Sequence, residues 1–447
     1  MKRYQIFLKY FSIFLVFLIG LIFCFSLSRG DTFANYGFSY ALWMREIPYV
    51  DFNMVIPPFS PFFYSLGLWI HPSILTIYIE QALLLTGFFF LMEKMIGKKV
   101  FLFFTVLFLM WPISFCTVLF PGYNFICVFL LFLLIYLEEK NAPDLWMGIL
   151  LGILICTKQT VGVFLFLPTL LYWKNPKRIG KRIVGTFIPV SILCIYLFIT
   201  KSFSSFIDLC FLGLFQFGSQ NHGFSLFYFI MFLLGFLYLV FCIFQNPKNR
   251  SLYYFLCFFI VAVPILDYYH VSLFLLGPLF IWIQSLSIKD STYKTIGAFG
   301  VFFYVLGGVM TVSFLYKPVV AFYSNFPFYV VSSSYDQDVR DLNQYLKDSP
   351  YEKIFLLMGS ENYMFKIMNH EKITYYDLPN SGNYGVHGEE KMIQKIESLH
   401  NVLFIVDREL CKDTNSSQQY ICSFKESALK NSEMIQSFGH FQVYYRK

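Results

Sequence analysis

Two carboxylates stand in a short polar stretch between apolar runs of this chain. Asp31 directly follows the first run, and Asp51 lies within Arg45–Phe52, which reads Arg-Glu-Ile-Pro-Tyr-Val-Asp-Phe and leads to Pro57-Pro58. A carboxylate at the edge of a bilayer is costly, and such residues commonly have a functional role. A carboxylate that lies beside a substrate hydroxyl group can act as a general base, because it accepts the proton while the hydroxyl oxygen attacks an electrophilic carbon. Asp51 has an equally good structural interpretation, as an acceptor for loop amides.

Three further polar clusters follow other apolar runs. One contains Tyr123, one contains Lys158-Gln159, and one runs from Asp267 to His270. Lys158 has an ordinary alternative, since a Lys at the end of a span often extends its ammonium group to the interface. Asp267 and His270 are three positions apart and would share one face of a helix. These residues are therefore candidates to bind a polar substrate.

Long apolar helices must position these groups. The 447 residues are 57% hydrophobic and only 14% charged, and several runs of eighteen or more residues carry almost no charge, which is typical of membrane spans. The sequence predicts an α-helical polytopic membrane protein with about eleven spans. These are expected near residues 10–29, 74–93, 100–117, 124–138, 145–157, 160–173, 183–200, 225–244, 252–266, 271–287 and 295–316.

The distribution of Lys and Arg predicts the orientation. With the N-terminus in the cytoplasm, the inner connections hold sixteen Lys and Arg and the outer connections hold five. This bias is the positive-inside pattern. The net charge of +7 is then mainly a topology signal, and nucleic-acid binding is not expected. All four polar clusters fall on the outer face in this arrangement, which predicts a multi-pass plasma-membrane protein with an external active site.

The composition changes after Lys317. We expect a transmembrane domain at 1–317, with its first outer loop at 30–73, and an extracytoplasmic α/β domain at 318–447. Strands are predicted at 354–358, 373–376, 402–406 and 441–445, alternating with helices, so a largely parallel sheet is expected. Cys411 and Cys422 lie in this outer region, where a disulfide can form.

At these residues the chain resembles the GT-C glycosyltransferases, polytopic enzymes that use lipid-phosphate sugars, such as protein O-mannosyltransferases and lipid A aminoarabinose transferases. The matches are Asp31, the run from Gly37 through Arg45–Phe52 to Pro58, Gly148 to Thr160, and Pro264 to His270. Many members carry an Asp-Glu pair where this chain has Asp31-Thr32, so a paired-acid or metal-binding role is not carried over. The tail is most similar to bacterial members that act on cell-envelope polysaccharides.

The resemblance implies an inverting glycosyltransferase of the bacterial cell envelope. Asp31 would be the general base, with Asp51 as a second catalytic candidate. Lys158 and then Arg45 would stabilise the leaving phosphate, since charge-assisted hydrogen bonds are strong. Tyr123, Gln159, Asp267 and His270 would orient the donor phosphate or sugar.

The implied partners are a polyprenyl-phosphate-linked sugar, a glycan acceptor and the lipid bilayer. No metal ligands are assigned, and the use of a divalent cation stays open. Two alternative activities remain at the level of sequence, beside the class of a non-catalytic envelope scaffold. One is a lipid-linked oligosaccharide ligase or transferase of the same topology. The other is a polyprenyl-linked sugar flippase or transporter, although transporters usually have polar residues at mid-membrane and internal repeats.

Overall fold

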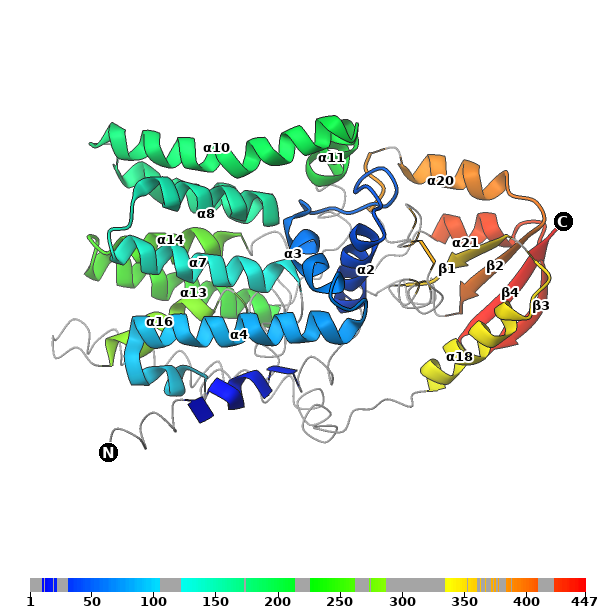
Figure 1. Cartoon of the computed structure of the whole chain (residues 1–447), viewed down its shortest axis with the longest axis horizontal. Coiled ribbons are helices and arrows are strands. Elements are labelled where there is room, and N and C mark those ends of the chain that lie inside the picture. Colours follow the sequence, from blue (N-terminus) through cyan, green and yellow to red (C-terminus); the bar gives the residue numbers. More distant parts are fainter. Residues whose placement is uncertain are drawn as a thin grey trace. The chain divides into compact units, whose positions relative to one another are not determined.

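The computed structural model is mostly helical and has one small sheet in its C-terminal region (Figure 1). The structure describes residues 10–11, 13–18, 20–21, 31–104, 122–172, 174–213, 226–261, 273, 275–286, 334–351, 353–359, 383–386, 388–408 and 422–447, together with a few positions within 362–377.

Contacts divide the chain into two compact units. The first contains residues 1–27, 74–193 and 223–329, and the second contains residues 28–73, 194–222 and 330–447. The second unit therefore combines the stretch after the first apolar run with the C-terminal region, a grouping that no change in composition indicates.

The described part of the first unit contains seven whole α-helices and most of α10, which continues into the second unit from Cys194. Their bounds are α4 Ile74–Ile96, α7 Tyr123–Glu139, α8 Asp144–Thr157, α9 Gln159–Phe166, α10 Pro176–Ile199, α13 Leu226–Gln245, α14 Arg250–Ile260 and α16 Leu276–Ser285. Three helical stretches of the described residues, 74–104, 176–199 and 228–245, are long and apolar enough to cross a membrane. The membrane-like helical character is thus confirmed, while the number of eleven spans stays a prediction. The predicted spans at 100–117 and 295–316 lie largely outside the described residues.

Glycines bring α8 and α10 into backbone contact. A Cβ atom on Gly148 would lie 2.2 Å from the Arg182 carbonyl oxygen, and one on Gly185 would lie 2.3 Å from the Leu145 carbonyl oxygen. Small residues allow helices in membranes to approach this closely and gain van der Waals contact. The two helices therefore form a tightly packed pair.

A buried arginine joins the neighbouring ends of four helices. Arg182 of α10 is fully buried and donates to Glu138 Oε2 at 2.7 Å, to Asp144 Oδ1 at 2.9 Å and to the Tyr254 hydroxyl at 2.9 Å. These partners belong to α7, α8 and α14. A buried charge without partners would be strongly unfavourable, so this ion-pair network fixes the four helix ends together.

The second unit contains a four-stranded mixed sheet. The strands are β1 Ile354–Leu357, β2 Val402–Asp407, β3 Glu433–Phe438 and β4 Phe441–Arg446, in the order β1-β2-β4-β3. Only β1 and β2 are parallel, and β4 is antiparallel to both of its neighbours. The predicted strands at 354–358, 402–406 and 441–445 are confirmed, but the largely parallel sheet is wrong. The cause is the β3–β4 hairpin, which turns at Gly439 with φ +50° and was not predicted. The predicted strand at 373–376 lies mainly outside the described residues.

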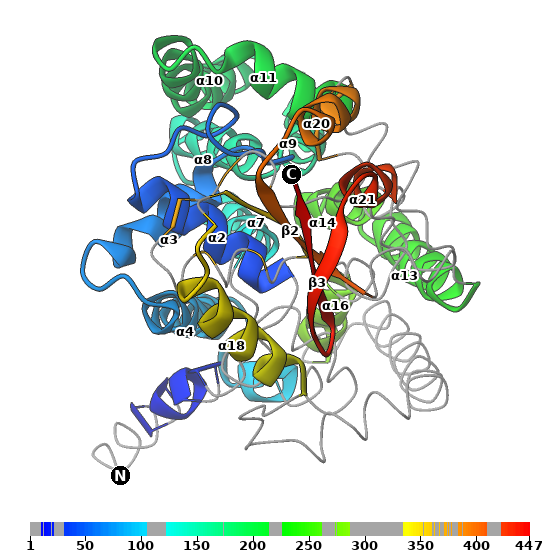
Figure 2. The same ribbon diagram turned by 90° about the vertical axis from the view of Figure 1, so that its right-hand side faces the viewer.

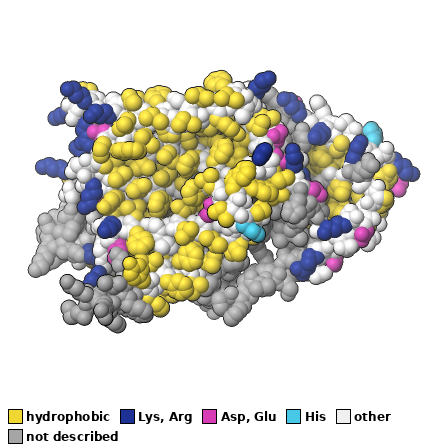
Figure 3. Space-filling model, in the orientation of Figure 1, with side chains coloured by type: hydrophobic (Ala, Val, Ile, Leu, Met, Phe, Trp, Pro, Cys, Tyr) yellow, Lys and Arg dark blue, Asp and Glu magenta, His cyan; other side chains and the backbone are white. Residues whose placement is uncertain are grey.

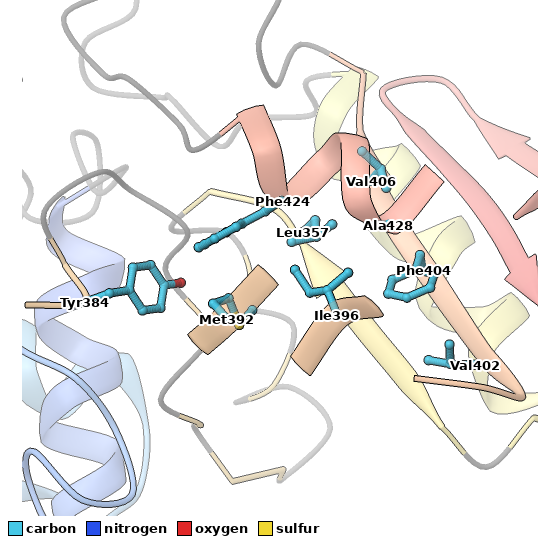
Figure 4. Close-up of a cluster of buried hydrophobic side chains, with 9 residues drawn as sticks. All are labelled: Leu357, Tyr384, Met392, Ile396, Val402, Phe404, Val406, Phe424 and Ala428. Carbon is cyan, nitrogen blue, oxygen red and sulfur yellow. The ribbon is translucent and has the colours of Figure 1, made fainter. Parts of the chain in front are cut away.

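Helices cover both faces of this sheet (Figure 2). Helix α18, Ser334–Lys347, packs Leu342 and Leu346 against one face. Helices α20, Gly388–Glu397, and α21, Cys422–Leu429, pack Met392, Ile396 and Phe424 against the other (Figure 4). Strand β2 is buried on both faces for this reason, which explains its unbroken apolar sequence. The α/β layer architecture predicted for this region is present.

The remaining helices of the second unit lie earlier in the chain. They are α2 Asp31–Trp43, α3 Phe59–Leu68, α11 Phe203–Ile207 and a π-helical turn at Asp208–Leu212. Hydrogen bonds join these segments to the C-terminal region. The amide of Val386 donates to Asp208 Oδ1 at 3.1 Å, and Asn53 Nδ2 donates to the Asn383 carbonyl oxygen at 2.6 Å. These bonds help explain why the three segments form one unit.

Candidate functional site

The first candidate, Asp31, begins a helix. The sequence predicts a loop over 30–73, whereas the structure has α2 from Asp31 to Trp43 and α3 from Phe59 to Leu68 within it. The structure describes the backbone of Asp31 but not its side chain, so its role as the base stays a prediction.

The connection between α2 and α3 is a tightly folded loop, residues 44–58, in which Asp51 has a defined partner. Asp51 Oδ2 accepts from the Ile47 amide at 2.7 Å, and the Asp51 amide donates to the Ile47 carbonyl oxygen at 2.9 Å. Arg45 and Tyr49 have positive φ values of 64° and 67°. Asp51 thus stabilises a turn, as the alternative interpretation of its sequence position predicts.

Buried aromatic residues anchor this loop. Tyr49 and Phe52 have exposed fractions of 1% and 0%. The Tyr49 hydroxyl donates to the Ile56 carbonyl oxygen at 2.6 Å, and its ring lies 5.3 Å, edge-on, from that of Phe206. The ring of Phe52 stacks on that of Phe38 at 5.9 Å. The loop is therefore held as part of the core of the second unit, although it contains several charged groups.

Glu46 is the residue that sequence reasoning missed. Its side chain is buried, with an exposed fraction of 4%, and neither carboxylate oxygen has a hydrogen-bond partner among the described residues. The buried hydroxyl of Tyr40 also has no partner there. Burial raises the pKa of Glu46 to about 7, and the charge of Lys372 partly opposes this increase.

A carboxyl group with a pKa near 7 is well suited to proton transfer. Nothing in the local sequence distinguishes Glu46 from an ordinary exposed loop acid, since it follows Arg45 at the end of a helix. Its burial depends on residues that are far away in the chain. The Lys366–Asp377 ion pair, at 2.8 Å, also contributes to the electrostatic environment of Glu46.

Arg45 is exposed and lies over an aromatic ring. Its guanidinium carbon is 5.9 Å from the centroid of the Trp69 ring, a cation–π distance. Trp69 itself has an exposed fraction of 59%. The guanidinium group is therefore accessible to an anionic ligand from solvent.

Lys158 occupies a break between two helices of the first unit. Its extended backbone, with φ −150° and ψ 104°, separates α8 from α9. The ammonium group donates to Asn124 Oδ1 at 3.3 Å and lies 5.1 Å from the centroid of the Tyr123 ring. Gln159 is the first residue of α9 and is buried. The structure thus brings together Tyr123, Asn124 and Lys158, which the sequence assigned to two separate clusters.

The predicted site residues are distributed over both units. Asp31, Arg45 and Asp51 belong to the second unit, and Tyr123, Lys158 and Gln159 belong to the first. Asp267 and His270 lie outside the described residues. Within the described part of the chain, no group of three or more His, Cys, Asp or Glu side chains is arranged to hold a metal ion.

Cys422, at the start of α21, is disulfide-bonded. Its predicted partner, Cys411, lies outside the described residues. Disulfides persist in oxidising compartments, and the bond is compatible with an extracytoplasmic location for this region.

No protein-family model matches the chain, and no curated protein matches its sequence.

Proposed function

We propose that this protein is a membrane glycosyltransferase that moves a sugar from a polyprenyl phosphate to an acceptor hydroxyl of a cell-envelope glycan on the outer membrane face. The observation that carries the proposal is the loop at residues 44–58. It is folded into the core of its unit and yet contains a buried carboxyl group with a near-neutral pKa. An apolar membrane protein rarely retains such a group without a chemical role.

The reaction needs one base and one anion-stabilising group. The acceptor oxygen attacks the anomeric carbon and forms the new glycosidic bond, while the bond from that carbon to the phosphate oxygen breaks. A carboxylate takes the hydroxyl proton, and the polyprenyl phosphate leaves with the bonding electrons. Attack from the face opposite the phosphate inverts the anomeric centre.

Asp31 is our first candidate for the base, as the family resemblance implies, and Glu46 is its competitor. Burial raises the pKa of Glu46 to about 7, which suits a proton acceptor, whereas Asp51 Oδ2 accepts from the Ile47 amide. Lys158 is the first candidate to stabilise the leaving phosphate, because Asn124 and Tyr123 hold its ammonium group in place. Arg45 is the second, and Tyr123, Gln159, Asp267 and His270 would orient the donor.

The base is identified by comparing three isosteric variants with a purified polyprenyl-phosphate sugar. We expect Asp31→Asn to reduce kcat by at least about a hundredfold, in line with the effect of a general base. Asp51→Asn should mainly lower the unfolding temperature. If Asp31→Asn retains near-normal turnover and Glu46→Gln loses it, the base is Glu46. If both retain turnover, the proposed chemistry is wrong.

The phosphate role of Lys158 has a separate measurement. Lys158→Ala should raise the KM for the donor and lower kcat, while the KM for the acceptor stays unchanged. A change confined to acceptor dependence would contradict the role. Lys201→Ala, which alters an exposed Lys in the second unit, is the matched control.

A further inference from the structure

A cavity of about 480 Å³ opens at the end of the first unit where α8 and α10 begin. The turn at residues 141–145, between α7 and α8, forms one wall. Arg178 and Lys181, from the first turns of α10, line it as well. Figure 3 shows Lys and Arg side chains gathered at this end of the helical unit, next to a broad apolar surface. The cavity lies far along the chain from the loop that contains Glu46.

The charges around this cavity leave an excess of positive charge. Arg178 donates to both oxygens of Asp144, at 2.9 and 3.1 Å, but the same carboxylate also pairs with Arg182. The side chain of Lys181 is exposed and has no ion-pair partner among the described residues. Asp144 and Glu138 thus balance Arg178 and Arg182, the charge of Lys181 is left over, and an anion in the cavity would be attracted.

The guanidinium group of Arg178 is held in a fixed position by its neighbours. The guanidinium carbons of Arg178, Arg182 and Arg250 lie 4.0, 4.4 and 3.9 Å from the centroid of the Tyr172 ring. The glycine contact between α8 and α10 fixes the backbones on both sides of the cavity. Arg178 and the backbone of the cavity would therefore need little reorganisation to bind an anion, which favours affinity.

An apolar stripe continues from the cavity along α10. Val184, Ile188, Ile192 and Ile195 follow Lys181 at helical spacing and have exposed fractions between 43% and 64%. Fourteen residues of helix span about 21 Å, which exceeds the roughly 15 Å hydrocarbon depth of one leaflet. Trp146, with an exposed fraction of 59%, stands beside the turn, and Trp is enriched at the interface between membrane and water.

We infer that this cavity binds the phosphate headgroup of an anionic phospholipid, with Lys181 and Arg178 facing the phosphate and one acyl chain lying along Val184, Ile188 and Ile192. A cationic cavity that opens onto an apolar helix face matches the two parts of such a lipid. A free phosphate would contact only the cavity, and a neutral lipid would contact only the apolar stripe on α10. The inference depends on insertion into a membrane and is independent of the proposed transfer reaction.

The full-length protein in a neutral detergent tests this inference. Phosphatidylglycerol, phosphatidylcholine and inorganic phosphate are titrated in parallel, and the thermal unfolding temperature is measured. We expect saturable stabilisation by phosphatidylglycerol alone. Lys181→Glu should raise the half-saturating concentration by at least about tenfold, since it removes a cation and also places an anion beside the phosphate. Lys181→Gln should raise the half-saturating concentration by a smaller factor. This variant replaces Lys181→Glu in the test if the charge reversal disturbs folding.

The matched control is Lys248→Glu, the same charge change at an exposed Lys in the turn between α13 and α14. It should leave the half-saturating concentration unchanged. Equal shifts in the Lys181 and Lys248 variants would overturn the inference. Equal stabilisation by phosphatidylcholine would also overturn it. Full stabilisation by inorganic phosphate at the same concentration would overturn it as well, because the cavity would then bind anions without any need for a lipid.

Discussion

The carboxyl group of Glu46 is buried and has no hydrogen-bond donor among the described residues. Its titration therefore makes the stability of the fold dependent on pH. Burial raises its pKa from 4.5 to about 7, so the folded protein holds the proton more tightly than the unfolded chain does. The resulting stabilisation is complete below pH 4.5 and is lost as the pH rises through 7. At 1.36 kcal/mol for each pKa unit, it amounts to at most about 3 kcal/mol.

The variant Glu46→Gln is neutral at every pH and keeps the shape of the side chain. It should match the wild type at pH 5 and be more stable at pH 8, by about 1–3 kcal/mol. The measurement is the unfolding midpoint in detergent at the two pH values. Glu390→Gln removes an exposed carboxylate from α20 and should show no such difference between the two pH values. A wild-type protein whose stability does not fall between pH 5 and pH 8 would contradict this account of Glu46.

The sequence identified Asp31, Asp51 and Lys158 because each is a charged residue beside an apolar run. It did not identify Glu46, since its environment includes Lys366 and Lys372, more than 300 positions later in the chain. The hydrogen bond that explains Asp51 is local and was anticipated as one of two interpretations. Local contacts can thus be anticipated from sequence, and long-range burial cannot.

Among the elements, the α8–α10 pair depends most on the absence of side chains. Gly148→Ala would place a Cβ atom 2.2 Å from the Arg182 carbonyl oxygen, and the helices would have to separate. We expect a loss of about 1–3 kcal/mol of unfolding free energy, typical of overpacking. Gly180→Ala in α10 meets no atom within 4 Å and is the control. It should be neutral or slightly stabilising because Ala favours a helix. Equal effects of the two substitutions would rule out the contact as the cause.

Helix α2 shows why a whole element escaped prediction. Asp31, Asn35, Gly37 and Ser39 give Asp31–Trp43 the composition of a loop. The helix instead packs against α3, with Tyr36 and Tyr40 buried. Tertiary packing overrides weak local propensity in such segments. The spans at α4, α10 and α13 were predictable because long apolar runs leave few alternatives.

Strand β3 was missed for a different reason. Four of its six residues are exposed, and a register shift between Met434 and Gln436 interrupts the regular alternation. Edge strands commonly contain such irregularities, which hinder pairing with other chains. Without β3 the hairpin could not be anticipated, and strand direction was therefore assigned from the alternation of strands and helices alone.

For the whole molecule, the charge bias predicts that the turn between α13 and α14 is cytoplasmic and the sheet-containing region extracytoplasmic. Lys248→Cys and Lys353→Cys place exposed thiols in these two regions. In intact cells a membrane-impermeant maleimide should label the Cys at 353 and should label the Cys at 248 only after permeabilisation. The opposite labelling pattern would invert the orientation, and an external catalytic site would then be untenable.

The position of β4 in the sheet has a consequence for biosynthesis. Strand β2 ends at Asp407, but its antiparallel partner does not begin until Phe441. Arg446 is also buried, and it donates to the Ile396 carbonyl oxygen at the end of α20 and to the Ala428 carbonyl oxygen in α21. During synthesis, one side of β2 therefore stays open while more than thirty later residues leave the ribosome. A released chain truncated in this interval presents an apolar strand with one unpaired edge, which quality-control proteases and chaperones recognise.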